Sequence, residues 1–240
     1  MKKNLLLLFL ICSQSSLYAQ NNLNNPDFLI SSSIEDIVLV HMSSDLNKNN
    51  SEVKIGQKIG TIDKLPKKTS IKNDSKIKKS KEHYKNGEYE KAYEILINSI
   101  ENEPNNPFIL EPIARAQYKL PSKQKESFEN YKLLIHQLDS LNGTSKTKIT
   151  VDMWFIESYW KLGTLYMDNS EWKKAQYEIN RFLMSIQNMK GSVIYVQALA
   201  YLTECFFELD NQELYKHFAN RTLIYDPNNE YAKNCLKISD

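Results

Sequence analysis

The chain has few of the residues from which metal centres are built. Its 240 residues include only four histidines and three cysteines. The histidines are scattered without the spacing of metal ligands, at His41, His83, His136 and His217. Glu82-His83 has no second histidine at helical distance, as a zinc protease would need. The sequence therefore predicts neither a metal site nor a cofactor.

The motifs of nucleophilic and phosphate chemistry are also missing. No Gly-x-Ser-x-Gly elbow occurs, and Gly56-x3-Gly60 lacks the Lys-Ser/Thr pair of a phosphate-binding loop. The run from Asp226 to Glu230 is too short for a calcium loop and lacks its glycine. We therefore expect no catalytic residues and no enzyme activity.

Neither a charge excess nor a long apolar run is present beyond the first residues. The chain has 31 Lys and Arg against 29 Asp and Glu, and removal of Lys2 and Lys3 leaves 29 of each. A balanced charge argues against general nucleic-acid binding, which needs a basic surface. No later segment reaches the length of a membrane span.

The first 19 residues have the pattern of a secretory signal peptide. A positive start is followed by the apolar run Leu5 to Ile11 and by a small-residue cleavage site at residues 17–19. The run is too short to cross a bilayer. Ile11 disfavours lipidation of Cys12, because that processing site requires a small residue there. We expect an exported chain, located in the periplasm or associated with the cell surface.

Residues 20–72 are expected to be an N-terminal extension, mostly disordered. Residues 48–85 contain twelve lysines against four acids, which is typical of a solvated linker. Anchoring to anionic phospholipid or lipopolysaccharide, and hence peripheral envelope association, is the alternative. Val53 to Ile55 and Ile59 to Ile62 hint at a small hairpin.

Two stretches place large and small side chains where paired antiparallel helices need them. The first is Gly87-x-Tyr89-x2-Ala92-x3-Leu96-x2-Ser99-x4-Pro104, and the second is Leu162-Gly163-x2-Tyr166-x8-Ala175. Both resemble the tetratricopeptide repeat, whose period is about 34 residues. A single unit cannot bury its apolar face, so the resemblance implies further units on either side.

Weaker matches complete the repeat. One runs from Leu110 to Leu134 and needs an extra residue near Pro121, and another runs from Leu199 to Pro227 with bulky Tyr215 at a small-residue position. The run from Asn228 to Leu236 is expected to form a capping helix. The resemblance implies an all-α, right-handed superhelical solenoid over residues 73–240, built from four helix pairs plus this cap.

Polar and glycine residues mark the expected helix ends. Helix starts are predicted at residues whose side chains can accept a hydrogen bond from a first-turn amide, namely Asn106, Ser122, Ser170 and Ser192. Helix ends are predicted at Gly87 and Gly143, since glycine tolerates the left-handed conformation of a C-terminal cap.

The resemblance also implies a concave groove lined by the first helix of each unit. Carried over residue by residue, its partner-binding positions include Lys81, Tyr84, Lys85, Glu111, Arg115, Tyr118, Lys119, Trp160, Met167, Glu204 and Phe207. The apolar residues among them either contact a ligand or pack between helices. The charges predict a basic end and an acidic end, with Glu157, Asp168 and Glu208 in the acidic one.

The expected function is that of an exported scaffold binding a protein or peptide partner in an envelope or secretion assembly. An accessory sensing module is the alternative, with a peptide or a glycan stacking on Trp160 and the tyrosines. The spacing leaves open whether Cys205 and Cys235 form a disulfide in an oxidising compartment.

Overall fold

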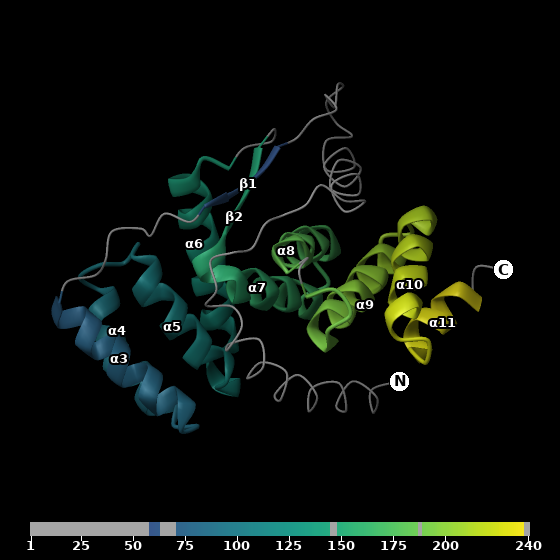
Figure 1. Cartoon of the computed structure of the whole chain (residues 1–240). Helices are drawn as coiled ribbons and strands as arrows, with labels where there is room; N and C mark the ends of the chain where they lie inside the picture. The colour runs from purple at the N-terminus through teal and green to yellow at the C-terminus, as the bar shows by residue number, and fades with distance from the viewer. Residues whose placement is uncertain (1–57, 63–70, 145–147, 187–188, 238–240) are drawn as a thin grey trace. The chain divides into compact units, whose positions relative to one another are not determined.

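The structure is a computed structural model that describes residues 58–62, 71–144, 148–186 and 189–237 (Figure 1). The predicted signal peptide and residues 20–57 of the extension lie outside these ranges. The described chain forms two compact units. The N-terminal unit extends to Leu165, and the described part of the C-terminal unit begins at Tyr166.

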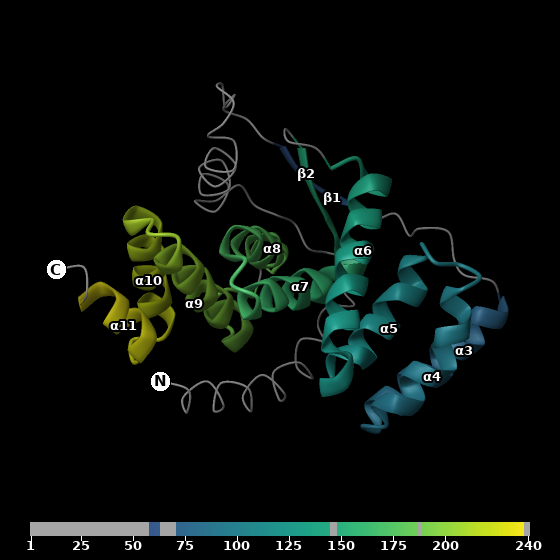
Figure 2. The ribbon, with the colours of Figure 1, turned by 180° about the vertical axis from the view of Figure 1, so that it is seen from behind.

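The N-terminal unit consists of two consecutive helix hairpins and a short sheet. Helix α3 packs on α4, α5 packs on both α4 and α6, and α3 also contacts α5 (Figures 1 and 2). Its elements are β1 (Lys58–Ile62), α3 (Ile71–Lys85), α4 (Tyr89–Ile100), α5 (Pro107–Tyr118), the 3-10 turn η1 (Pro121–Lys123), α6 (Gln124–Asn142), β2 (Lys148–Asp152), the 3-10 turn η2 (Met153–Phe155) and most of α7 (Ile156–Asp168).

The core of these hairpins is aliphatic. Leu96 of α4 and Ile109 and Ile113 of α5 are fully buried, and Ile77 of α3 packs against them. Ala92 has no exposed surface, so the small residue predicted from the repeat pattern lies inside the hairpin. Such contacts each remove apolar surface from water and hold helices that would be marginal alone.

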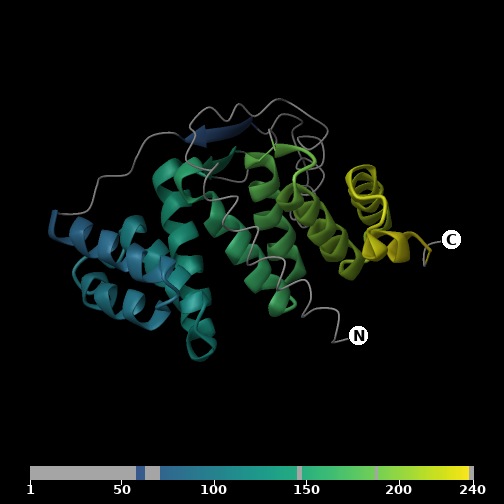
Figure 3. The same ribbon diagram turned by 60° about the horizontal axis from the view of Figure 1, so that its bottom comes forward.

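The C-terminal unit is a further set of packed helices. Its elements after α7 are α8 (Trp172–Ser185), α9 (Val193–Glu208), α10 (Gln212–Tyr225) and α11 (Glu230–Lys237). Helix α9 contacts both α8 and α10, and α11 contacts α9 and α10 at the yellow end of the ribbon (Figure 3). Phe206 and Phe218 stack between α9 and α10, with ring centroids 5.4 Å apart. Helix α11 buries Ala232 and Cys235 against its neighbours.

Three turns between paired helices share one backbone geometry. Gly87, Ser170 and Asp210 are left-handed, with φ of 78°, 58° and 53°. In each turn the amide of the following residue donates to a carbonyl five residues earlier, at 2.9 to 3.0 Å. Gly87 fulfils the prediction of a glycine stop, but the prediction that Ser170 caps α8 was wrong. Ser170 instead occupies the left-handed position, and Glu171 precedes the helix without a side-chain cap.

The other predicted helix ends are mostly confirmed. Asn106 accepts from the amide of Phe108 at 3.0 Å, and Ser192 accepts from Tyr195 at 3.4 Å. Gly143 ends α6 with a φ of 68°. Ser122 lies inside η1, so α6 begins two residues later, at Gln124.

A two-stranded parallel sheet joins residues far apart in sequence. Strand β1 pairs with β2 in register, with Ile59 opposite Ile149 and Thr61 opposite Val151. The predicted strand at residues 59–62 is therefore present, but its partner is β2. Residues 53–55, the other arm of the predicted hairpin, lie outside the described ranges. Among the described residues the remaining regular elements are helical, which confirms the all-α helical-repeat class.

Candidate partner-binding faces

The predicted groove positions lie on or at the end of the first helices of the repeat, α3, α5, α7 and α9. Some of them form two local clusters together with a tyrosine from another helix. One lies in the N-terminal unit and is named the Arg115 cluster, comprising Tyr84, Glu111, Arg115, Tyr131 and Glu157. The other lies in the C-terminal unit and is named the α9 face, comprising Asp168, Glu204, Phe207, Glu208 and Tyr231.

Arg115 is paired with two carboxylates. Glu111, one helical turn earlier on α5 and only 8% exposed, forms an ion pair with its guanidinium. Glu157 of α7 lies 3.6 Å from Arg115 Nη2. Burial by itself would lower the pKa of Arg115, but the two carboxylates, Glu111 first, outweigh burial and raise it. Arg115 therefore remains protonated, and the adjacent carboxylates balance its positive charge.

Two tyrosines line the same cluster. The Tyr84 ring on α3 lies edge-on to Tyr89, with centroids 5.1 Å apart, and 5.8 Å from Arg115 Cζ. Burial raises the pKa of Tyr84, and the negative charge of Glu157 raises it further. Tyr131 of α6 is fully buried, and its pKa is raised by burial and then by Glu111. The cluster is a packed polar contact between helices, with one cation shared by two carboxylates.

This arrangement corrects the predicted division of charge. Glu157 was assigned to the acidic end and Arg115 to the basic end, but the two lie within ion-pair distance of each other. Lys81 and Lys85 on α3 are exposed. The basic character predicted for this region therefore falls on lysines, and Arg115 is not available as an uncompensated cation.

The other predicted positions of the N-terminal unit are partly covered. Lys161 Nζ lies 4.4 Å from the centroid of the Tyr118 ring, and Lys119 is half-buried at the end of α5. Trp160 is only 6% exposed, so its ring is not available to stack on a glycan. The prediction from the sequence did not include Trp154 in η2. This residue is 53% exposed, and its backbone amide donates to the Asp152 side chain.

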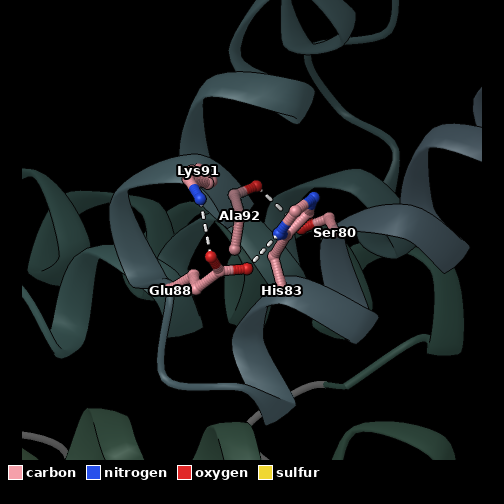
Figure 4. A network of polar contacts seen from close by, with 5 residues as sticks. All are labelled: Ser80, His83, Glu88, Lys91 and Ala92. Carbon is pink, nitrogen blue, oxygen red and sulfur yellow. Dashed lines mark hydrogen bonds and ion pairs between the residues drawn. The ribbon is translucent and has the colours of Figure 1, made fainter.

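The α3–α4 turn holds Lys81, Tyr84 and Lys85 in place. His83 Nδ1 lies 2.5 Å from Glu88 Oε2, and Lys91 Nζ lies 2.6 Å from Glu88 Oε1 (Figure 4). Ser80 Oγ donates to the carbonyl of Ala92 at 2.7 Å. The pKa of Glu88 is lowered by the hydrogen bonds from Lys91 and His83.

The α9 face contains three carboxylates and little compensation. Glu204 and Glu208 are one helical turn apart on α9, and Asp168 ends α7. The pKa of Glu204 is raised by burial and then by the negative charges of Glu208 and Asp168. Burial also raises the pKa of Asp168. Within the described part of the chain, none of the three carboxylates has an ion-pair partner.

Aromatic rings border these carboxylates. Phe207, a half-buried predicted position, lies edge-on to Tyr215 with centroids 5.5 Å apart. Tyr231 of α11 is 39% exposed, and its pKa is raised by burial and then by Glu204. Sequence reasoning placed Tyr231 in the capping helix but missed that it joins the face. The available signal was its i, i+4 spacing from Cys235, one of the two residues that α11 buries.

Cys205 and Cys235 are free buried thiols in the structure, so the disulfide that the spacing left open is not present. Burial raises the pKa of both thiols, and in Cys205 the nearby Glu204 adds to the effect. Thiols with raised pKa are poor nucleophiles. Met167, the remaining predicted groove position, is half-buried.

Two searches of the described residues bear on what the faces can hold. No cluster of three or more His, Cys, Asp or Glu in these ranges has a geometry suited to a metal ion. In the same ranges, no helix has the combination of length and apolar character needed to cross a bilayer.

Comparison with solved structures identifies the fold. The crystal structure of MamA protein matches with a TM-score of 0.50 at 15% identity, over 69% of this chain and 79% of that chain. A putative kinesin light chain with nearly identical TPR-like repeats, from Podosopora anserina, matches at 11% identity with a TM-score of 0.46, over 69% and 92% of the two chains. No family model and no curated protein matches the sequence. The repeats have the tetratricopeptide-repeat fold, as the resemblance predicted.

Proposed function

We propose that the chain is an exported scaffold that binds a protein partner through the exposed positions of its first helices, within an envelope or secretion assembly. The tetratricopeptide-repeat fold supports the general part of this role, because such repeats serve as platforms for protein–protein interaction. The envelope setting is supported by the sequence pattern of residues 1–19.

The observation that carries the proposal is the α9 face. Glu204 is partly buried beside two other carboxylates and has no basic partner among the described residues, and Tyr231 is half-exposed on the same face. They are the features of interaction surfaces, where aromatic rings supply contact area and charges select the partner. By contrast, the Arg115 cluster places a cation between its two carboxylates, so it contributes mainly to holding α5 and α7 in position.

A protein or peptide ligand is favoured over a glycan. The rival role is an envelope sensing module that binds a peptide or a glycan, with Trp160 and the tyrosines stacking on the ligand. Trp160 is buried, which removes one of the rings that a glycan would stack on. An extended or helical peptide needs no such platform, because its side chains can alternate between apolar and charged contacts along a helix face. We assign the chain no catalytic role.

Site-specific photo-crosslinking tests the interaction. A photoreactive residue at Glu208, exposed on the α9 face, should capture a protein in the native envelope that mass spectrometry identifies. The matched control is Glu213, also exposed but on α10, from which the same partner should not be captured. Equal capture from both positions, or capture from neither, would contradict the proposal.

Fractionation of cells tests the location. The chain should be found outside the cytoplasm without residues 1–19, and removal of those residues should retain it in the cytoplasm. Export would be contradicted if the full-length chain, with residues 1–19 still attached, were found among the cytoplasmic proteins.

A further inference from the structure

The α9 face brings three carboxylates together. Three acidic residues elsewhere in the C-terminal unit are paired, since Glu171 lies 2.5 Å from Lys174, Glu178 3.2 Å from Arg181, and Glu230 3.3 Å from Lys233. Among the described residues, Asp168, Glu204 and Glu208 have no such basic partner. Three carboxylates near one another repel, so an arriving positive charge would be stabilised by all of them.

The apolar surface at the same place fits a long cationic side chain. Phe207 lies on the same turn of α9 as Glu204 and Glu208, α11 packs on α9, and Tyr231 of α11 is close enough to both glutamates for their charges to raise its pKa. Lysine and arginine have aliphatic stems that pack on apolar surface while their charged ends remain in polar surroundings. Aromatic rings add a cation–π contribution.

Other ligand classes fit less well. The carboxylates are not placed to hold a metal ion, since the described part of the chain has no cluster of three or more ligating side chains suited to one. An acidic peptide would meet three like charges. A purely apolar segment would leave Glu204, which is already partly buried, with no compensating charge.

We propose that the α9 face binds a basic segment of a partner protein, with Lys or Arg side chains at Glu204 and Glu208 and their stems against Phe207 and Tyr231. The proposal depends on the proposed function, because it names the chemistry of the partner that this face would receive. A basic segment is expected at the α9 face and not at the Arg115 cluster, because the Arg115 cluster already contains a cation.

Binding of this kind is linked to pH. The folded chain holds the pKa of Glu204 above its usual range, because of burial and the two neighbouring carboxylates. A bound cation favours the ionised form, so binding releases protons from Glu204. The affinity for a basic segment should therefore rise with pH as Glu204 ionises, and it should fall with added salt.

Three peptides that differ only at their lysine positions provide the test. The probe is a short peptide with lysines at helical spacing between leucines, and its counterparts have Gln or Glu in place of every Lys. Fluorescence anisotropy with the full chain should show that the Lys peptide binds about tenfold more tightly than the Gln peptide. Glu204→Gln with Glu208→Gln should remove most of this difference, whereas the control Glu213→Gln, which removes the same charge from α10, should keep it.

The possible outcomes distinguish failure of this inference from failure of the proposed function. If the Gln or Glu peptide binds as tightly as the Lys peptide and Phe207→Ala weakens that binding, the face binds peptides but has no preference for basic ones. Insensitivity of all three peptides to Phe207→Ala would reject both proposals. Self-association that sedimentation detects and the double variant abolishes would assign the face to a second copy of the chain, which also overturns the proposal.

Discussion

The two units use the same repeat positions for different purposes. In the N-terminal unit, Glu111 and Glu157 neutralise Arg115, and the turn between α3 and α4 has a glycine at its left-handed residue. In the C-terminal unit, the acidic residues of α9 have no basic partner in the described ranges, and the corresponding turns have Ser170 and Asp210. One unit is thus built for stability, whereas the other retains uncompensated features that a binding surface can use.

The largest expected effect is the loss of Arg115. Arg115→Met leaves Glu111 buried without its cation, so the free energy of unfolding should fall by about 3 kcal/mol. Urea denaturation followed by circular dichroism measures this change. Combining Arg115→Met with Glu111→Gln should recover part of the loss, because the more deeply buried of the two carboxylates then carries no charge. A single variant within about 0.5 kcal/mol of wild type would show that the pair is not a stability element.

The turns should respond in opposite directions to changes at their left-handed residues. Gly87→Ala should destabilise by about 1 kcal/mol, because an L side chain is strained at a φ of 78°. No atom lies within 4 Å of the position of the added Cβ, so the cost is conformational and not steric. Ser170→Gly should stabilise by about 0.5 kcal/mol for the same reason. Thermal unfolding measures both stability changes. Changes of the same sign in the two variants would contradict the shared turn geometry.

A smaller effect is expected from Glu204. Its raised pKa means that the folded chain favours the protonated carboxyl, so this contribution to stability is present at low pH and lost as the pH rises through the raised value. Glu204→Gln should therefore stabilise the chain near neutral pH and make its free energy of unfolding less dependent on pH in this range. Glu213→Gln serves as the control and should leave this pH dependence unchanged. A destabilised Glu204→Gln variant would mean that the ionised carboxylate has a partner.

The smallest effect, of opposite sign, is expected in the α3–α4 turn. The lowered pKa of Glu88 means that its contribution is present above about 4.5, the ordinary value of a glutamate, and is lost as the pH falls through the folded value. Glu88→Gln should slightly destabilise the chain near neutral pH and remove this acid sensitivity. Glu90→Gln, at an exposed position of the same helix, is the control. Equal pH profiles for the two variants would show that the contacts in Figure 4 do not influence stability.

Much of the fold could be predicted because the repeat pattern is local. Ala92 and Ala175 mark close helix approaches, and Asn106 and Ser192 mark helix starts, because each of these roles depends on one side chain and its nearest turn. The prediction for Ser170 failed for an instructive reason. Serine suits a helix cap and a left-handed turn residue alike, and in the structure Ser170 takes the left-handed position while the amide of Glu171 donates to the carbonyl of Tyr166 at 2.9 Å.

The candidate site was predicted less completely. Positions on one helix, such as Glu204 and Phe207, were found from the repeat frame, since their spacing fixes their common side. The pairing of Arg115 with Glu157 joins α5 to α7, and Tyr231 reaches the α9 face from α11. The pairing of β1 with β2 spans a still longer stretch of chain. No local pattern encodes such contacts between elements.

The sequence by itself determined the helical repeat, its turns and the chemical type of each first-helix position. It did so because hydrophobic period, small residues and capping groups act over a few residues. The tertiary structure alone decided which of those charges are compensated. Glu157 and Glu204 are both glutamates on first helices, yet one lies beside an arginine and the other beside two carboxylates. Their charges differ in energy because that energy depends on the neighbouring charges in space.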